Sequence, residues 1–260
     1  MVKVIITGVE GKMGSTILHC AAKEANIVIV GLTEAKNHPS IGKVLETKWG
    51  MLAIEDDLSQ VIERGDVVID FTQPAASLEH IRLSKNHNKA IVIGTTGFSK
   101  EALSEIESMS GLKAVISPNM SVGMNLMFAV VERLSQIMKD DYDIEILEMH
   151  HRLKKDAPSG TALRLKDIIE GTHPQRGWIE VFGRTGITGE RKKEELGVMS
   201  LRGGDVVGEH TVLFAGTGER LEITHRAYSR ENFARGALVA AQWIVNQKHG
   251  IYNMKDVLGL

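Results

Sequence analysis

The stretch VKVIITGVEGKMGSTILHCAAKEA, residues 2–25, decides the fold. It opens with a mostly apolar and β-branched run, which is typical of a short buried strand. Gly8, Gly11 and Gly14 follow at once, and from Ser15 onward apolar residues recur at helical spacing. A strand, a glycine loop and a helix in this order form the setting that a dinucleotide-binding site needs.

The glycine loop GVEGKMG, residues 8–14, can bring backbone amides close to a pyrophosphate, and the helix after it offers unpaired N–H groups. Its spacing differs from the usual G-x-G-x-x-G, so a plain tight turn is the alternative. Glu34 ends the next apolar run, 20 residues past Gly14. A carboxylate there can accept hydrogen bonds from the adenosine ribose and repels a 2′-phosphate; the alternative is a solvated acid at a strand end.

Apolar runs and helical patterns alternate through the first half of the chain. We expect strands at 2–7, 26–32, 67–71, 90–93 and 113–116, helices at 15–25, 57–64, 75–89 and 100–109, and a loop at 35–50. This order predicts an α/β fold with a parallel, doubly wound sheet.

The pattern changes after Ser117. Helices are expected at 123–139 and 161–170, a strand at 143–149, and glycine-broken strands up to Thr224. The segments VVGEHTVLFA and RLEITHRA suggest antiparallel hairpins, so this part predicts a mixed, open-faced sheet. A final helix at 232–247 is expected to pack back on the first domain.

Composition is that of an ordinary globular protein. The 260 residues are 43% hydrophobic and 25% charged with a net charge of −2, which excludes disordered and coiled-coil classes and gives no positive field for nucleic acid. The single cysteine, Cys20, excludes an internal disulfide and fits a reducing compartment. No signal-peptide core or membrane-length apolar run is present, so we expect a cytoplasmic protein without a membrane partner.

Two further loops follow predicted strands at their carboxyl ends, where such sheets bind ligands. They are Asp70-Phe71-Thr72 and GTTGF at 94–98. Either could be a simple turn, but two small-residue loops on one sheet edge favour the floor of a cofactor site.

The segment EMHHRLKKDAPSGTA, residues 148–162, is the richest in chemistry. His150 and His151 leave a predicted strand, and a histidine is the usual proton donor near neutral pH. A metal site is disfavoured, because adjacent strand residues point to opposite faces and no third ligand is evident.

The same segment can bind an anion. Lys154 carries positive charge, and Ser159 is expected to cap a helix whose first amides, at Gly160 and Thr161, face outward. The segment therefore predicts a site for an acidic small molecule beside a proton donor. The alternative is a polar loop with incidental histidines.

Other segments receive structural roles. RGGDVVGEHTV at 202–212 predicts a hairpin with a bulge, and GERKKEELG at 189–197 a solvated loop. Cys20 and four methionines at near-helical spacing are expected in the core; the methionines are Met120, Met124, Met127 and Met138.

These segments together resemble the dihydrodipicolinate reductase family of the lysine and diaminopimelate pathway. The resemblance runs through nearly the whole chain and includes SPNMSVGMN (117–125) and THRAYSRENFARGA (224–237). It implies a Rossmann-type domain, residues 1–121 with 231–260, and a central α+β domain, residues 122–230, that binds substrate and forms a homotetramer. It also implies reduction of a cyclic dicarboxylate imine, 4-hydroxy-tetrahydrodipicolinate, to tetrahydrodipicolinate with NADH or NADPH.

The resemblance implies residue roles as well. His150 would be the acid/base residue and Lys154 a second proton donor or substrate stabiliser. The substrate carboxylates would be bound by His151, Ser159, Gly160 and Thr161. The cofactor would be held by Gly8, Val9, Glu10, Gly11, Lys12, Met13, Glu34, Gly94, Thr95, Thr96, Ser117, Pro118, Asn119 and Met120.

Two positions depart from the family pattern. Ala35 stands where members that accommodate NADPH well often have arginine, which argues against a strong NADPH preference. Met120 stands where an aromatic residue is common.

Three other classes are alternatives, two of them enzymes on a similar two-domain plan. A semialdehyde dehydrogenase needs a thiol nucleophile in its substrate site, and Cys20 beside the glycine loop is in the wrong place. A deaminating dehydrogenase acting on a diamino acid stays open from the residues alone. A regulator that binds NAD without turnover would leave the histidine and lysine segment unexplained.

Overall fold

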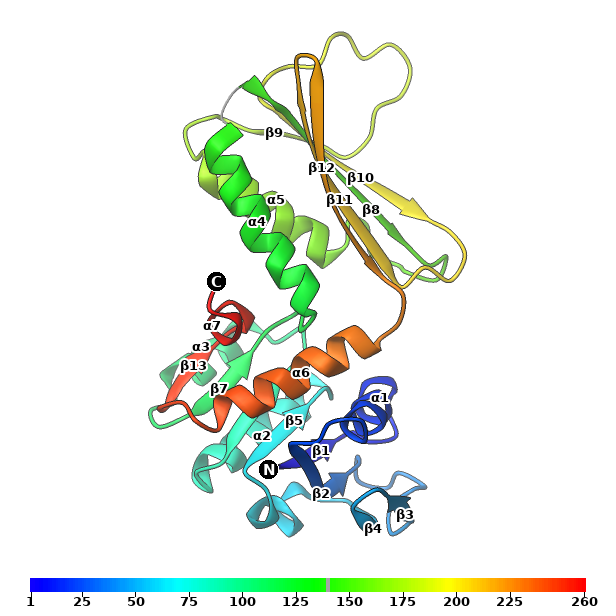
Figure 1. The fold of residues 1–260 in the computed structure, drawn as a ribbon, viewed down its shortest axis with the longest axis vertical. Helices are drawn as coiled ribbons and strands as arrows, with labels where there is room; N and C mark the ends of the chain where they lie inside the picture. Colours follow the sequence, from blue (N-terminus) through cyan, green and yellow to red (C-terminus); the bar gives the residue numbers. More distant parts are fainter. Residues whose placement is uncertain (139–140) are drawn as a thin grey trace. The chain divides into compact units, whose positions relative to one another are not determined.

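The computed structural model describes residues 1–138 and 141–260, and it divides into two compact units (Figure 1). The first unit is Met1–Val122 with Arg230–Leu260, and the second is Gly123–Ser229. Lys139, the last residue of the helix expected at 123–139, lies outside the described residues.

An eight-stranded sheet forms the centre of the first unit, in the order β13-β7-β6-β5-β1-β2-β4-β3. Parallel pairs join β1 to β2 and to β5, and β5 through β6 to β7, so the predicted parallel sheet is confirmed. The bounds are β1 Val2–Thr7, β2 Ile27–Thr33, β5 Val67–Asp70, β6 Ala90–Ile93 and β7 Lys113–Ile116. Because the chain crosses to opposite sides of β1, the ligand crevice is expected at the carboxyl ends of these strands.

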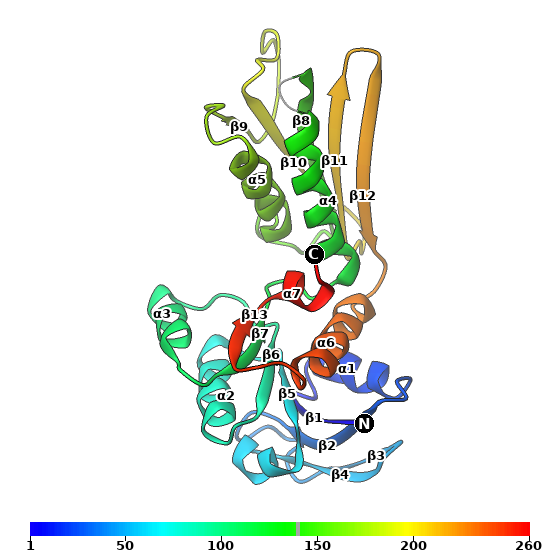
Figure 2. The ribbon, with the colours of Figure 1, turned by 60° about the vertical axis from the view of Figure 1, so that its left-hand side comes forward.

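Helices cover both faces of this sheet, as Figure 2 shows. Val4 and Ile6 of β1 pack on the side of α1 (Lys12–Ala21) and α6 (Glu231–Ile244). Ile5, between them, packs on the side of α2 (Pro74–Asn86) and α3 (Lys100–Ser108). Alternate strand residues point to opposite faces, so a strand buried on both sides shows a continuous apolar run.

Three local expectations for this unit are wrong. The loop expected at 35–50 contains β3 (Val44–Thr47), which forms a hairpin with β4 (Gly50–Glu55); β3 is an edge strand with little apolar signal. The helix expected at 57–64 is two short 3₁₀ turns, Leu58–Gln60 and Ile62–Arg64. Helix α1 begins at Lys12 rather than Ser15, directly after the glycine loop.

The last residues of the chain complete the first unit. Strand β13 (Gly250–Tyr252) pairs with β7, and α7 (Met254–Leu258) follows it. Neither element is predicted from the sequence, because three and five residues are too few to show a period.

The second unit has a mixed five-stranded sheet, as predicted, in the order β12-β11-β8-β10-β9. The hairpin expected at 202–212 is wrong, because β8 lies between the two strands that this segment connects. The central strand β8 (Asp143–His150) is parallel to β10 (Glu195–Arg202) and antiparallel to β11 (Gly208–Gly216). The outer strands are β12 (Glu219–Ala227) and β9 (Ile179–Val181). Helices α4 (Val122–Met138) and α5 (Gly160–Thr172) pack on one face and bury its apolar side chains (Figure 1).

The solvated loop expected at 189–197 is wrong at its end. Strand β10 begins at Glu195, and Leu196 is fully buried. The guanidinium of Arg191 donates to Asp143 and Glu145 on β8, so this basic residue fastens the loop to the sheet instead of facing solvent.

The expected core residues are buried as predicted. Cys20, Met120, Met124 and Met127 are at most 4% exposed, and Met138 packs against the core of the second unit. No helix in the described part of the chain has both the length and the apolar character to cross a membrane.

Candidate functional site

Three strands of the second unit bring four polar side chains together. Burial alternates along β8, so Glu148 and His150 lie on the same buried face as Ile144 and Ile146. The strand register places Arg202 of β10 opposite His150 and His210 of β11 opposite Glu148. Glu148, Arg202 and His210 were not expected to act in the site. All three lie in the sequence motifs described above, but only the register of the sheet brings them close to His150.

The Glu148 carboxylate is the centre of this cluster. It is 1% exposed and receives two hydrogen bonds from the Arg202 guanidinium, at 2.8 and 2.9 Å. The backbone N–H of Ser159 donates to it at 3.1 Å, and His150 Nδ1 lies 2.6 Å from it. Burial raises the pKa of Glu148, but the bonds from Arg202 and His150 outweigh it and lower the pKa to about 2. Glu148 is therefore ionised at neutral pH.

His150 lies at the end of β8 and is 9% exposed. Because an ionised carboxylate only accepts, Nδ1 of His150 carries the proton of the bond to Glu148. This leaves Nε2 as the atom for proton exchange, and a side chain at Gly208 would place its Cβ 3.1 Å from it. Burial lowers the pKa of His150 below its ordinary value, although the Glu148 carboxylate acts in the opposite direction.

His210 is a second, neutral imidazole beside the first. Its ring stands edge-on to that of His150, with the centroids 5.2 Å apart. Burial, and then the charge of His150, lower the pKa of His210 to about 3. Its Nε2 lies 3.0 Å from the Ser159 hydroxyl, so the ring supports the start of α5.

The start of α5 has the form predicted from the sequence. Ser159 is its N-cap, and its hydroxyl accepts a hydrogen bond from the Ala162 N–H at 3.2 Å. The first turn contains no acidic residue, and Gly160 is exposed with open space where a Cβ would lie. Such a helix start favours an anion. Lys154 lies in the turn before it and pairs with Asp156 at 2.9 Å.

His151 follows β8 directly and is partly buried. Its backbone N–H donates to the Val206 carbonyl at 2.7 Å, and its carbonyl accepts from the Lys154 N–H at 3.1 Å. These bonds fix the turn that carries His150 to Lys154. Among the described residues no group of three His, Cys, Asp or Glu side chains could hold a metal ion.

The glycine loop in the first unit fits a dinucleotide. Gly8 has φ +63°, and a side chain at Gly14 would place its Cβ 2.1 Å from the Gly8 carbonyl oxygen. No side chain caps α1 at Gly11, and its first turn has no acidic residue, so its start favours a pyrophosphate. The Glu34 carboxylate follows β2 and accepts from the N–H groups of Glu10, at 3.0 Å, and Ala35, at 2.8 Å.

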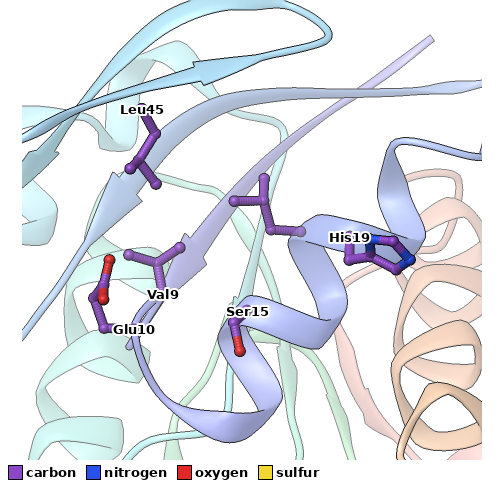
Figure 3. Close-up of a pocket in the computed structure, with 6 residues that line it drawn as sticks. Val9, Glu10, Ser15, His19 and Leu45 are labelled. Atoms are coloured by element: carbon purple, nitrogen blue, oxygen red, sulfur yellow. The ribbon is translucent and has the colours of Figure 1, made fainter.

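A cavity of about 320 Å³ opens beside this loop. Its lining comes from the loop, helix α1 and the hairpin and consists of Val9, Glu10, Ser15, Leu18, His19 and Leu45. Figure 3 shows this cavity. Val9 and Glu10 are among the expected cofactor residues, whereas Leu45 belongs to the hairpin that was expected as a loop.

The loops after β5 and β6 pack on each other. A Cβ at Gly94 would lie 2.0 Å from the Phe71 ring, so only glycine fits there. The Thr95 hydroxyl donates to the Asp70 carboxylate at 2.9 Å. Asp70 also accepts from Thr72, Ser77 and His80, which makes it the anchor of this corner. Thr96, the next residue of the loop, is exposed.

The loop after β7 holds itself in place. The Ser117 hydroxyl donates to the Asn119 carbonyl at 2.8 Å, and the Asn119 side chain accepts from the Ser121 N–H at 2.9 Å. Pro118 is exposed, but Met120 is 1% exposed and its side chain faces the core. The loops of the first unit that contain the expected cofactor residues follow parallel strands and so lie on one sheet edge. The expected substrate residues belong to the second unit.

Comparisons with known proteins cover the whole chain. Residues 2–120 match the family model "Dihydrodipicolinate reductase, N-terminus" and residues 123–258 match "Dihydrodipicolinate reductase, C-terminus". The 4-hydroxy-tetrahydrodipicolinate reductase of Syntrophus aciditrophicus is 46% identical, with 100% of this chain and 99% of that protein covered. The enzyme of the same name from Methanocaldococcus jannaschii is also 46% identical, with 100% and 98% covered.

Solved structures agree. Dipicolinate-bound dihydrodipicolinate reductase from Paenisporosarcina sp. TG-14 matches with a TM-score of 0.77 and 26% identity, covering 98% of this chain and 99% of that one. A scyllo-inositol dehydrogenase from Lactobacillus casei shares the fold, with a TM-score of 0.60, 16% identity and coverage of 99% and 93%. The two family models and the full-length relatives show that this chain belongs to the dihydrodipicolinate reductase family.

Proposed function

We propose that His150 is the proton donor of this enzyme and that Lys154 and the start of α5 bind its substrate. The chain is a pyridine-nucleotide-dependent oxidoreductase that reduces 4-hydroxy-tetrahydrodipicolinate to tetrahydrodipicolinate in lysine and diaminopimelate biosynthesis. The product lacks the hydroxyl of the substrate, so the reaction takes up a hydride and a proton and releases water.

The observation that carries the proposal is the orientation of His150. Its Nδ1 is bound to the Glu148 carboxylate, so the proton that can leave is the one on Nε2. The nicotinamide supplies the hydride when it is bound. The imidazolium of His150 gives its Nε2 proton to the negative charge that then develops on the substrate. The ring is left neutral, with its remaining proton on Nδ1.

The substrate carries two carboxylates, and the second unit offers two kinds of partner for them. Lys154 supplies a point charge, while Ser159, Gly160 and Thr161 supply the start of α5. His151 is proposed as a further partner, and its carbonyl accepts a hydrogen bond from the Lys154 N–H in the turn after β8. The relative from Paenisporosarcina binds dipicolinate, a pyridine with two carboxylates, which supports a dicarboxylate site in this chain.

For the cofactor, we propose that both NADH and NADPH bind and that Glu34 accepts hydrogen bonds from the adenosine ribose. The residues assigned to the cofactor are Gly8 to Met13, Glu34, Gly94 to Thr96 and Ser117 to Met120. Met120 is buried, so its backbone rather than its side chain would face the cofactor. The negative charge of Glu34 and the lack of arginine at Ala35 favour NADH.

We further propose that residues 1–121 with 231–260 bind the dinucleotide and that residues 122–230 bind the substrate. The assembly proposed is a homotetramer that works in the cytoplasm. The support is the family membership, and light scattering of the purified protein measures the oligomeric state directly.

The experiment that tests the proposed function compares turnover of the purified wild type with that of His150→Gln. We expect kcat to fall by about 10²–10⁴-fold, the usual weight of general acid catalysis, with the dissociation constant of NADH nearly unchanged. Lys154→Ala should instead weaken the binding of the substrate and of pyridine-2,6-dicarboxylate alike, by roughly 10- to 150-fold. Full activity of His150→Gln across the pH range would remove His150 from the mechanism.

A further inference from the structure

The Glu148 carboxylate joins the proposed proton donor to the proposed anion site. It accepts the Nδ1 proton of His150, the Ser159 N–H at the start of α5, and two N–H groups of Arg202. These three partners belong to β8, α5 and β10. A single buried carboxylate therefore bonds to both the acid and the helix that should receive the substrate.

We infer that Glu148, held by Arg202, is the positioning residue that sets the tautomer and the proton affinity of His150. This inference rests on the proposed role of His150. Glu148 is not a catalytic residue, because it acts through the histidine.

The chemistry at His150 follows from the charge of its partner. An ionised carboxylate accepts from Nδ1, so in the neutral ring the proton stays on Nδ1 and Nε2 is free to take one up. The same carboxylate stabilises the imidazolium by charge. Without it, the ring could also hold its proton on Nε2, and the imidazolium would lie buried without a counter-ion.

The other groups around His150 oppose Glu148. Lys154 in the following turn and Arg202 on β10 are cationic, and both lower the pKa of His150. His210 on β11 lies ring to ring with it and, being neutral, supplies no negative charge. Burial also favours the neutral ring. Glu148 is thus the group in this cluster that keeps a proton available on His150.

Arg202 sets the position of the carboxylate. Its two Nη atoms bind the two Glu148 oxygens, and Nη2 also donates to the Asp156 carbonyl. A bidentate pair fixes both the distance and the plane of a carboxylate. The cluster therefore allows two substitutions with opposite effects on His150. Removing Glu148 takes away a favourable charge, and removing Arg202 takes away an unfavourable one.

The test is the pH dependence of kcat in Glu148→Gln. Activity requires the imidazolium, so kcat falls as the pH rises through the pKa of His150. Glutamine removes the negative charge, and this fall should move to lower pH by about one unit or more, with a roughly 10-fold or greater loss of kcat near neutral pH. Arg202→Met should move the fall to higher pH. The KM for NADH should change little in either variant.

Two controls separate the possible failures. Glu145→Gln removes another arginine-paired carboxylate of β8, on the opposite face, and its pH profile should match that of the wild type. His150→Gln tests the proposed function itself. If it keeps full activity, the proton donor lies elsewhere. If it loses activity while Glu148→Gln and Arg202→Met keep the wild-type pH profile, the positioning role of Glu148 is overturned.

A measurement on the wild type covers the case in which either variant fails to fold. Nitrogen NMR of histidine-labelled protein reports which ring nitrogen carries the proton, and the His150 signals are those missing from the His150→Gln spectrum. Above its pKa, His150 should carry its proton on Nδ1. A proton on Nε2 instead would overturn the inference, whatever the variants show.

Discussion

At the scale of the residue, Glu34 combines a structural and a recognition role. Its carboxylate accepts hydrogen bonds from two backbone N–H groups, that of Glu10 in the glycine loop and that of the adjacent Ala35. Its position is therefore fixed before a cofactor binds. A fixed carboxylate can accept hydrogen bonds from ribose hydroxyls without further loss of side-chain entropy.

We therefore predict that Glu34→Ala weakens the binding of NADH more than the binding of NADPH. The loss for NADH should be about 1.5–3 kcal/mol, the value for a hydrogen bond to a charged group, and the NADPH loss should be smaller because a repulsion disappears with the carboxylate. Fluorescence titration of both cofactors measures the two affinities. Equal losses, or none, would contradict the role of Glu34.

At the scale of the element, Asp70 ties three segments of the first unit together. Its buried carboxylate is at the last residue of β5 and accepts hydrogen bonds from Ser77 and His80 of α2 and from Thr95 after β6. Burial raises the pKa of Asp70, but the hydrogen bond and the charge of His80 outweigh it, so the pKa is lowered. The corner that carries the GTTGF loop depends on this one negative charge.

We predict that Asp70→Ala lowers the free energy of unfolding by about 3–5 kcal/mol, the range for removing one partner from a buried pair. Asp66→Ala is the matched control, because Asp66 precedes the same strand but makes an exposed hydrogen bond to the Lys3 N–H. Urea unfolding compares the two. If Asp70→Ala costs no more than Asp66→Ala, the Asp70 hydrogen bonds add nothing to stability.

The elements also show how far sequence reasoning reaches. Strands such as β5 and β6 are predicted because they are buried on both faces and read as apolar runs. Hairpin β3–β4 is not, because its edge strand is half exposed. His150 and Ser159 belong to one short segment, so the sequence predicts a proton donor at the first and a helix N-cap at the second. Arg202 enters the site through its ion pair with Glu148, which is 54 residues away in the sequence, and no local pattern reveals such a contact.

At the scale of the whole molecule, pH acts on the stability of the folded state through its buried titratable groups. His210 has a pKa of about 3 in the folded protein, below its ordinary 6.5. Between about pH 3 and pH 6.5, His210 therefore binds a proton in the unfolded chain but not in the folded one. The contribution of His210 to the free energy of unfolding is fully present above about pH 6.5 and is lost as the pH falls toward 3.

We predict that the wild type loses a few kcal/mol of stability between about pH 6.5 and 4, since each pH unit over which one proton is taken up costs roughly 1.4 kcal/mol. His210→Asn should flatten this dependence, and the exposed His19→Asn should not. Urea unfolding followed by tryptophan fluorescence at several pH values measures it. An equal slope in His210→Asn and wild type would show that His210 is protonated in the folded state.

The shared carboxylate of Glu148 has a consequence for how this chain can vary. Its partners reach it from a strand neighbour, a helix start and a strand some fifty residues further on. A change at Arg202 alone leaves the buried Glu148 carboxylate without its bidentate partner, and a change at Glu148 alone leaves the partly exposed Arg202 guanidinium without its carboxylate. A lineage that alters one position is therefore expected to gain from a compensating change at the other. The two residues form a single heritable unit, although neither their codons nor their secondary-structure elements adjoin.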